Sequence, residues 1–305
     1  MSPAKATTLT SYPFTDILGW SVSRYDTFQS CRRKYYYDYY NKYDTEFPRA
    51  KIIQLKSMTT LALEAGNIVH DAIKTLLERL LKTEDPIDTT RFMAYARRKA
   101  ADYTAAKTFA EVYYRETPAM EPQTVFALVE QCLTAFLQSP RFAWITEKAV
   151  RNKTGWIIEP GGFGETRIDG LKAYCKVDFL FPVDGRIHIL DWKTGKPAVQ
   201  KHRKQMVGYA AWASQQCGAA LENIEPTVAY LRPPYAESTI AVNEFDAQEF
   251  SSAVAAETAE MHALCATVER NVPRPKESFP QTARTGLCKY CNYRELCGRA
   301  AVTEG

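Results

Sequence analysis

Apolar side chains recur at helical spacing through the first half of the chain. Between Thr59 and Leu81 they fall three or four positions apart, at Val69, Ala72, Ile73, Leu76, Leu77 and Leu80. The same period returns at Val125, Leu128, Val129, Cys132, Leu133, Phe136 and Leu137 and stops before Pro140. Such stripes are typical of helices that bury one face. Together with a less regular helix between them, these two segments predict a helical layer.

From Trp156 onwards the pattern changes to short runs typical of strands. They are Trp156 to Glu159, Ala173 to Phe181, Ile187 to Lys193, and Thr227 to Leu231. A helix is expected between the last two, from Val199 to Cys217, with Gly218 as its C-terminal cap. A final helix is expected from Ala247 to Arg270, with Cys265 in its apolar stripe. This order predicts an α/β core sheet with a large helical attachment.

The segment 176–193, KVDFLFPVDGRIHILDWK, holds polar residues at both ends of a predicted β-hairpin. Asp178 stands at one end, and Asp191 and Lys193 stand two apart, on one face of the strand, at the other. Two carboxylates and an ammonium group at the mouth of a hairpin can hold a hard divalent cation and stabilise negative charge beside it. Phosphodiester hydrolysis requires both, so the pattern is typical of a nuclease.

Composition places the chain among ordinary globular proteins. It has 305 residues, 46% of them hydrophobic and 24% charged, which suffices for one decorated domain or two smaller ones. The formal net charge of +4 is weak support for a polyanionic partner, but Lys193 to Lys204 contains five basic residues and no acid. This run and the shorter Arg32 to Lys34 fit either a solvated face or phosphate contact.

No stretch of the chain is typical of membrane or secreted proteins. The first twenty residues lack an apolar signal segment, and no run approaches the ~18 apolar residues of a membrane span. A cytoplasmic location without a membrane partner is therefore expected. The chain also lacks the GxxxxGK[ST] pattern, so any coupling to DNA unwinding requires a separate helicase.

Eight cysteines in such a chain indicate metal binding or buried thiols rather than disulfides. Cys288, Cys291 and Cys297 have CxxCx5C spacing, and a closed metal site needs a fourth ligand. Cys31, within SRYDTFQSCRRKYYY, is the natural candidate, because Cys132, Cys175, Cys217 and Cys265 are most simply core or helix-end thiols. The residues alone leave zinc and iron–sulfur both open.

Six motifs follow one another in a characteristic order. They are SxSRYDxFxxC ending at Cys31, GxxxH from Gly66 to His70, KVD at Asp178, DWKTG from Asp191 to Gly195, QxxxY from Gln205 to Tyr209, and CxxCx5C. In this order the chain resembles a RecB-type nuclease of the PD-(D/E)xK superfamily, in its iron–sulfur branch. That branch includes nuclease domains of helicase-nucleases and CRISPR-associated RecB-like nucleases. The resemblance spans nearly the whole chain.

The resemblance implies a restriction-endonuclease-like core sheet flanked by helices, with a large N-terminal helical layer. A 4Fe-4S cluster on Cys31, Cys288, Cys291 and Cys297 would join the two termini as a clamp. One nuclease domain would comprise an N-terminal segment (1–58), the helical layer (59–150), the nuclease core (151–240) and the C-terminal helix with the cysteines (241–305). The tyrosines between positions 35 and 43 would mostly shield the cluster and fill the domain seam, with base stacking as the alternative.

The resemblance also assigns site residues. His70, Asp178 and Asp191 would bind Mg²⁺ or Mn²⁺, and Lys193 would lie beside the attacking water or the scissile phosphate. Gln205 and Tyr209 would support the site and contact nucleic acid, with helix packing as the alternative. Glu159, at the end of the first predicted strand, is a further candidate acid.

The expected function is a metal-dependent DNA nuclease, an exonuclease on single strands or strand ends, in repair, recombination or anti-phage defence. DNA is the expected partner, together with a separate helicase or CRISPR adaptation proteins. Two alternatives remain open. In the first, the chain is a catalytically silent DNA-binding subunit of a helicase-nuclease or of a CRISPR adaptation complex. In the second, it is a structural domain held together by zinc.

Overall fold

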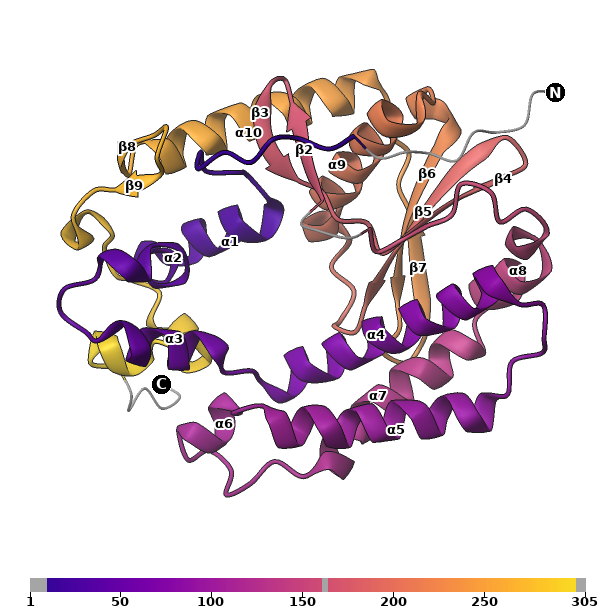
Figure 1. Ribbon diagram of the computed structural model, residues 1–305, viewed down its shortest axis with the longest axis horizontal. Helices are drawn as coiled ribbons and strands as arrows, with labels where there is room; N and C mark the ends of the chain where they lie inside the picture. Colours follow the sequence, from indigo (N-terminus) through magenta and orange to yellow (C-terminus); the bar gives the residue numbers. More distant parts are fainter. Residues whose placement is uncertain (1–9, 161–163, 300–305) are drawn as a thin grey trace.

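A five-stranded sheet forms the centre of the protein (Figure 1). The computed structural model describes residues 10–160 and 164–299. The strand order is β1 (Ile157–Ile158), β4 (Phe179–Val183), β5 (Arg186–Lys193), β6 (Ile224–Tyr230) and β7 (Ala236–Thr239). Neighbouring strands are antiparallel except β5 and β6, which are parallel. The result is a mixed α/β fold around a mostly antiparallel sheet, consistent with the predicted core.

The predicted hairpin is the β4–β5 pair, in which Phe179 faces Leu190 and Val183 faces Arg186. The two-residue turn consists of Asp184 and Gly185, with φ angles of +50° and +79°. A hairpin turn with two left-handed residues favours Asp-Gly, because its twist matches that of the strands. The short turn fixes the register, and the register decides which side chains meet at the open end.

The crossover from β5 to β6 is the helix α9 (Val199–Cys217), with the bounds predicted from sequence. Gly218 ends it at φ +66°, in the left-handed conformation that glycine adopts without strain. Gly208 lets α9 pack closely on α10 (Glu244–His262), because an added Cβ would lie 2.7 Å from the Phe250 ring. The two helices together cover one face of the sheet (Figure 1).

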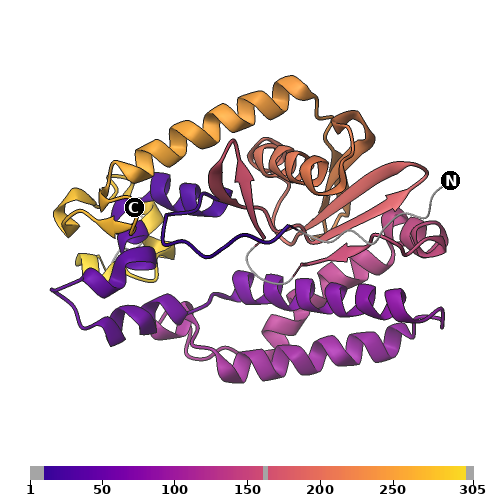
Figure 2. The same cartoon turned by 45° about the horizontal axis from the view of Figure 1, so that its top comes forward.

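The predicted helical layer covers the other face of the sheet (Figure 2). It contains α4 (Leu61–Lys82), α5 (Thr89–Ala106), α7 (Pro122–Leu137) and α8 (Pro140–Glu147). Thr60 caps α4, since its side chain accepts a hydrogen bond from the Leu63 backbone N–H. The buried face of α4 holds the apolar residues that the sequence predicted for it. The layer thus positions α4, and the residues on it, against the sheet.

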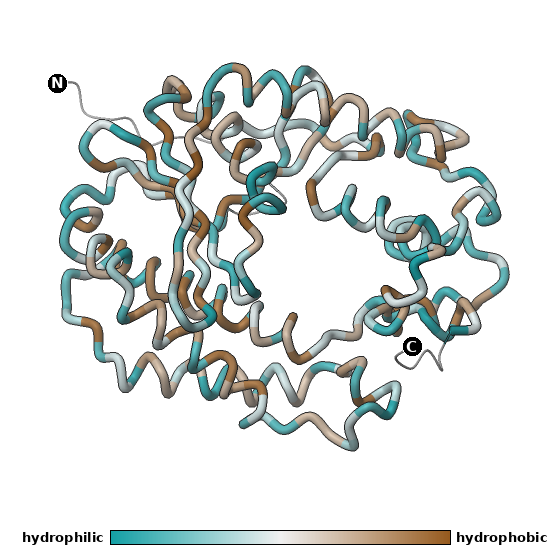
Figure 3. Tube along the Cα trace, turned by 180° about the vertical axis from the view of Figure 1, so that it is seen from behind, coloured by the Kyte–Doolittle hydropathy of each residue, from teal (hydrophilic) through white to brown (hydrophobic). Residues whose placement is uncertain are grey.

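Two hydrophobic cores lie on opposite faces of the sheet. Along β5, Ile189 belongs to the core under α9 and α10, whereas Leu190 and Trp192 belong to the core under the helical layer. Because successive side chains on a strand alternate in direction, Asp191 and Lys193 share the α9 side with Ile189. Figure 3 shows hydrophobic positions recurring along these strands.

The first and last described segments lie side by side at one end of the molecule (Figures 1 and 2). The first contains α1 (Val22–Ser30), α2 (Arg32–Tyr40) and α3 (Arg49–Ser57), and the last contains two 3-10 turns (Thr285–Tyr290 and Arg294–Cys297). Tyr35, Tyr36, Tyr37 and Tyr40 are buried, and rings of the first segment pack on Phe279 and Tyr293 of the last. Most of the tyrosine-rich segment is therefore core, as expected.

Three predicted elements differ from the structure. The run from Ala173 to Phe181 divides into β3 (Leu171–Tyr174) and β4, because β3 pairs with β2 (Glu165–Ile168) in a separate hairpin. The last helix ends at His262 rather than Arg270, because the chain turns back into a small hairpin of β8 (Cys265–Thr267) and β9 (Val272–Pro273). Cys265 is therefore a buried thiol on a strand, not in a helical stripe.

The third difference concerns the first strand, which has two residues instead of four because Glu159 leaves it with a φ of +35°. The strands β2, β7, β8 and β9 and the helices α1, α2, α3, α6 (Ala110–Tyr113) and α8 have no counterpart in the prediction. Among the described residues, no helix has the length and apolar character needed to cross a bilayer.

Candidate functional site

The open end of the β4–β5 hairpin brings the predicted acidic residues together. Asp178 lies just before β4, and Asp191 and Lys193 lie near the end of β5. The Trp192 backbone N–H donates a 2.8 Å hydrogen bond to Oδ2 of Asp178. This bond ties the two strand ends together and orients the Asp178 carboxylate.

The helix α4 carries His70 to the same place. Its Nδ1 lies 3.4 Å from Oδ2 of Asp178. Gly66, one turn earlier, allows the approach, because a Cβ there would lie 3.1 Å from Oγ1 of Thr194, directly after Lys193. The predicted GxxxH motif therefore combines a close helix contact with an imidazole on the same helix face.

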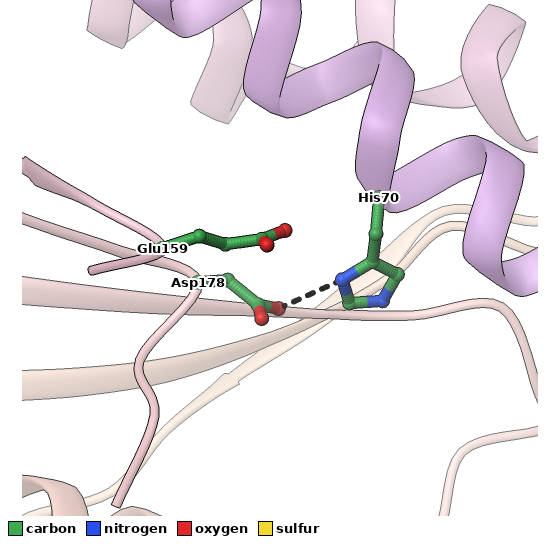
Figure 4. Close-up of side chains that lie close together, drawn as sticks. All are labelled: His70, Glu159 and Asp178. Atoms are coloured by element: carbon green, nitrogen blue, oxygen red, sulfur yellow. Dashed lines mark ion pairs between the residues drawn. The ribbon is translucent and has the colours of Figure 1, made fainter. Parts of the chain in front are cut away.

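Glu159 completes a cluster of three possible metal donors (Figure 4). One donor atom each from His70, Glu159 and Asp178 lies within 4.8 Å of the others. The strained φ of +35° at Glu159 accompanies a 2.9 Å hydrogen bond from its N–H to the Asp178 carbonyl. Imidazole with carboxylate oxygens suits Mn²⁺ or Mg²⁺, with water completing the coordination. The candidate acid proposed from sequence thus joins two of the predicted ligands.

Electrostatics couples the charged groups of the cluster. Burial alone would lower the pKa of His70, but the charge of Asp178 and the hydrogen bond that the imidazole donates to its carboxylate raise that pKa to about 9. Burial works against the ionised form of Asp178, yet His70 and the Trp192 N–H hold its pKa below the ordinary value. Burial and the neighbouring Asp178 raise the pKa of Asp191 to about 6. A divalent cation would stabilise carboxylates crowded in this way, because it offsets their mutual repulsion.

Asp191 is almost fully buried, and its Oδ2 lies 2.6 Å from Nζ of Lys193. It stands outside the group of three donors, although its charge acts on both His70 and Asp178. Direct ligation by Asp191 therefore stays a prediction. The pair with Lys193 places a cation where negative charge beside a bound metal would be stabilised.

Gln205 and Tyr209 lie one turn apart on α9 and are hydrogen-bonded to each other. Nε2 of Gln205 donates to the Tyr209 hydroxyl over 2.7 Å, and that hydroxyl donates to the Lys176 carbonyl over 2.6 Å. Because Lys176 precedes Asp178 by two residues, the pair holds the backbone that carries the carboxylate. Contact of either side chain with nucleic acid stays a prediction.

Replacement of Tyr209 by phenylalanine tests this supporting role. Tyr209 is buried, so the change leaves the Lys176 carbonyl without its donor at nearly constant volume. We expect a loss of about 1–3 kcal/mol in the free energy of unfolding, the usual cost of an unsatisfied buried polar group. Urea denaturation measures it. Tyr235→Phe, which removes a half-buried hydroxyl bonded to Glu237, is the matched control. Equal small losses in both variants would contradict the role.

Two lysines were not anticipated beside Glu159. Nζ of Lys176 lies 3.4 Å and Nζ of Lys74 3.8 Å from Oε2 of Glu159. Lys74 follows His70 by four positions, so helical spacing alone indicated that they share a face. The position of Glu159 itself depends on backbone geometry that periodicity does not encode. These lysines balance the acids of the cluster.

The four predicted cluster cysteines gather where the first and last segments meet. Burial raises the pKa of Cys291 to about 11, with smaller contributions from Cys31 and Cys297. Burial is the main cause that raises the pKa of Cys297, and the neighbouring Cys31 and Cys288 thiols raise it further. Within 10–160 and 164–299, no three sulfurs lie within 4.8 Å of one another. The four cysteines are thus neighbours, without the close grouping of sulfurs that a tetrahedral metal site has.

Hydrogen-bond donors surround two of these sulfurs. Cys31 lies between α1 and α2, and its Sγ accepts from the Lys34 backbone N–H over 3.5 Å. The Arg299 guanidinium donates to Sγ of Cys288 over 3.1 Å. Hydrogen-bond donors therefore face the sulfurs of both Cys31 and Cys288 at the junction of the first and last segments.

Comparisons with known proteins bear on this arrangement. Among curated proteins, none matches the chain. The solved structures similar to it include the crystal structure of SSO0001, at 16% sequence identity and a TM-score of 0.30. The match covers 63% of this chain and 80% of the SSO0001 chain. Residues 19–298 match the family model of the PD-(D/E)XK nuclease superfamily, whose members are metal-dependent nucleases. Since that match covers nearly the whole chain, the protein belongs to the PD-(D/E)XK nuclease superfamily.

Proposed function

We propose that the protein is a metal-dependent DNA nuclease that degrades single strands from an end. The observation that carries the proposal is the convergence of His70, Glu159 and Asp178 beside the Asp191–Lys193 pair. These residues come from α4, the end of β1, the start of β4 and β5, with Glu159 just after β1 and Asp178 just before β4, so the fold, rather than one local motif, assembles them. The superfamily's use of divalent metals gives this donor set its chemical meaning.

His70, Glu159, Asp178 and Asp191 would hold Mg²⁺ or Mn²⁺, which polarises a phosphoryl oxygen and lowers the pKa of a bound water. The chain itself supplies the remaining functions. The Lys193 ammonium stabilises the negative charge that develops on the phosphate. Trp192 N–H fixes the Asp178 carboxylate, and Tyr209 fixes the backbone before it. Positioned groups of this kind lower the barrier because they need no reorganisation during the reaction.

Cleavage of end-labelled linear and circular single-stranded DNA tests the proposal. The protein is purified anaerobically and assayed with Mn²⁺, Mg²⁺ or EDTA. We expect metal-dependent loss of the linear strand alone, with the fate of the label giving the polarity. Cleavage of the circle would replace exonuclease by endonuclease action. Tight DNA binding without cleavage in either metal would favour a catalytically silent subunit.

We further propose a 4Fe-4S cluster on Cys31, Cys288, Cys291 and Cys297. The neighbouring sulfurs and their N–H donors support it, because such hydrogen bonds are a common feature of iron–sulfur sites. Zinc bound tetrahedrally at Zn–S distances of about 2.3 Å brings sulfurs to roughly 3.8 Å from one another. No three cysteine sulfurs of the described residues come that close together, so the choice of a 4Fe-4S cluster over zinc rests on the resemblance of the motifs.

Substitution of single cysteines checks this assignment. Cys31→Ser and Cys288→Ser are expected to lose the brown colour and most of the bound iron, and to melt at a lower temperature. The reason is that either change opens a link between segments more than 250 residues apart. Iron analysis, visible absorbance and thermal melting are the measurements. Cys217→Ser, at the end of α9, is the control that should keep the iron. A colourless wild-type protein with bound zinc would contradict the cluster.

A further inference from the structure

A cavity of about 460 Å³ opens beside Lys193, away from His70 and Glu159. Its walls come from the start of α1, the end of β3, the first half of α9 and Phe250 of α10. Besides Lys193 and the supporting Gln205 and Tyr209, it is lined by Asp26, Tyr174, Lys201 and His202. Its volume lies within the range of pockets that bind small organic ligands.

The charge of the cavity suits an anion. Lys176, Lys193 and Lys201 line it together with one acid, Asp26. Lys176 also pairs with Glu159, and Lys193 pairs with Asp191, so both belong to the candidate metal centre. Lys201 is exposed and, in the described part of the chain, has no ion-pair partner. It is therefore the ammonium group available to a bound phosphate.

A hydrogen-bond chain connects His202 to the backbone before α9. The Ala198 backbone N–H donates to the Tyr230 hydroxyl oxygen over 3.4 Å, and that hydroxyl lies 2.9 Å from Nδ1 of His202. The hydroxyl, whose oxygen accepts from Ala198, has its own proton available to donate to Nδ1, and we take this arrangement for the neutral ring. A neutral imidazole then carries its proton on Nε2. Burial, followed by the charges of Lys193 and Lys201, lowers the pKa of His202 and favours this neutral form.

Tyr174 gives the cavity a fixed aromatic wall. Its ring packs so closely on the backbone of Gly19 that a Cβ at that glycine would lie 2.3 Å from Cε2. Tyr174 also ends β3, whose partner strand and bridge to Trp20 hold the backbone in place. A rigid ring next to an ammonium group and an imidazole N–H matches the base, sugar and phosphate of a nucleotide.

We propose that this cavity binds one unpaired nucleotide next to the scissile phosphate, with Lys201 and Nε2–H of His202 bonded to its phosphate and Tyr174 against its sugar or base. The proposal rests on the proposed nuclease function and deepens it. Walls from four elements enclose a volume suited to one nucleotide, and a paired base would bring a second strand into the same space. The cavity thus selects single strands or frayed ends.

Binding of fluorescein-labelled oligothymidylate in EDTA, followed by anisotropy over a series of salt concentrations, tests the inference without cleavage. Lys201→Gln is expected to weaken binding roughly tenfold, the usual value of a charged hydrogen bond. It should also reduce the slope of log affinity against log salt by about 0.7, the contribution of one phosphate contact on a single strand. Thymidine monophosphate should compete with the oligonucleotide, and a blunt duplex should not.

Three further variants sharpen the test. His202→Ala is expected to weaken binding, and His202→Gln, whose amide reaches the position of Nε2, should restore it. Lys148→Gln removes one exposed charge at the end of α8 and should leave both the affinity and the salt slope unchanged.

Wild-type affinity and slope in Lys201→Gln and His202→Ala, or equal competition by the duplex, would overturn the inference. Wild-type cleavage decides the proposed function separately. If the wild-type protein cleaves DNA but the variants bind DNA as tightly as the wild type, only the proposed role of the cavity is refuted. If the wild-type protein never cleaves DNA but the variants bind it more weakly, only the proposed nuclease activity is refuted.

Discussion

Asp191→Asn is expected to reduce metal-dependent cleavage about 10³-fold or more while DNA binding stays within a few fold of wild type. Several kcal/mol of transition-state stabilisation come from a bound metal, and each 1.36 kcal/mol is a factor of ten in rate. The buried Asp191 carboxylate is also the partner of Lys193, so the change removes a charge from the centre and frees the ammonium group that the mechanism requires in place. Single-turnover cleavage of labelled single-stranded DNA measures the loss.

Asp184→Asn is the matched control, because it makes the same chemical change at the opposite end of the same hairpin. Asp184 is exposed and occupies the left-handed region, which asparagine also tolerates. The cleavage activity of the Asp184→Asn variant should equal that of the wild type. If Asp191→Asn keeps magnesium-dependent cleavage, the Asp191 carboxylate is not part of the active site, and the assignment of the site to this end of the hairpin is wrong.

Lys276→Met is expected to lower the free energy of unfolding by about 3–5 kcal/mol, the usual cost of removing one partner of a buried ion pair. Nζ of Lys276 lies 2.7 Å from Asp44 and 2.6 Å from Glu46, and the Asp44 side chain is fully buried. The ammonium group also lies over the rings of Tyr37 and Phe47. Methionine keeps the volume but leaves the Asp44 carboxylate without its cation. Urea denaturation of both proteins measures the difference.

Lys51→Met is the matched control for this stability effect. Lys51 pairs with Glu295 at 2.7 Å across the same junction of the first and last segments, but both side chains are partly exposed. Such a pair contributes about 0.2–1 kcal/mol. The double variant Lys276→Met/Asp44→Asn should recover part of the loss, because it removes the uncompensated charge. Equal losses in Lys276→Met and Lys51→Met would show that burial does not strengthen the pair.

The sequence predicted the parts of the fold that depend on local pattern. Helices α4, α7 and α9 appear where apolar spacing put them, and the Asp184–Gly185 turn defines the hairpin that joins Asp178 to Asp191. These elements succeed because periodicity and turn chemistry act over a few residues. The motif residues His70, Asp178 and Asp191 come close to one another at the open end of that hairpin, and their roles stay predictions.

What the sequence did not predict depends on contacts between distant segments. The division of the 173–181 run follows from pairing of β3 with β2, which alternation of apolar residues does not reveal. The early end of α10 follows from the β8–β9 hairpin. At the site, the approach of Glu159 to His70 and Asp178 needs a left-handed residue just after β1. The Tyr230–His202 arrangement likewise exists only once α9 packs on β6.

The packing of the last segment on the first has a consequence for biosynthesis. Tyr35, Tyr36 and Tyr40 pack around Phe279, which is 239 to 244 residues later in the chain. Ribosomes add about 5–20 residues per second, so these tyrosines wait roughly 10–50 s for their partner. Until then α2 exposes aromatic surface on a nascent chain. The core around these tyrosines is therefore completed only after Phe279 has been synthesised, and chains that stop before it are the ones most exposed to chaperones and aggregation.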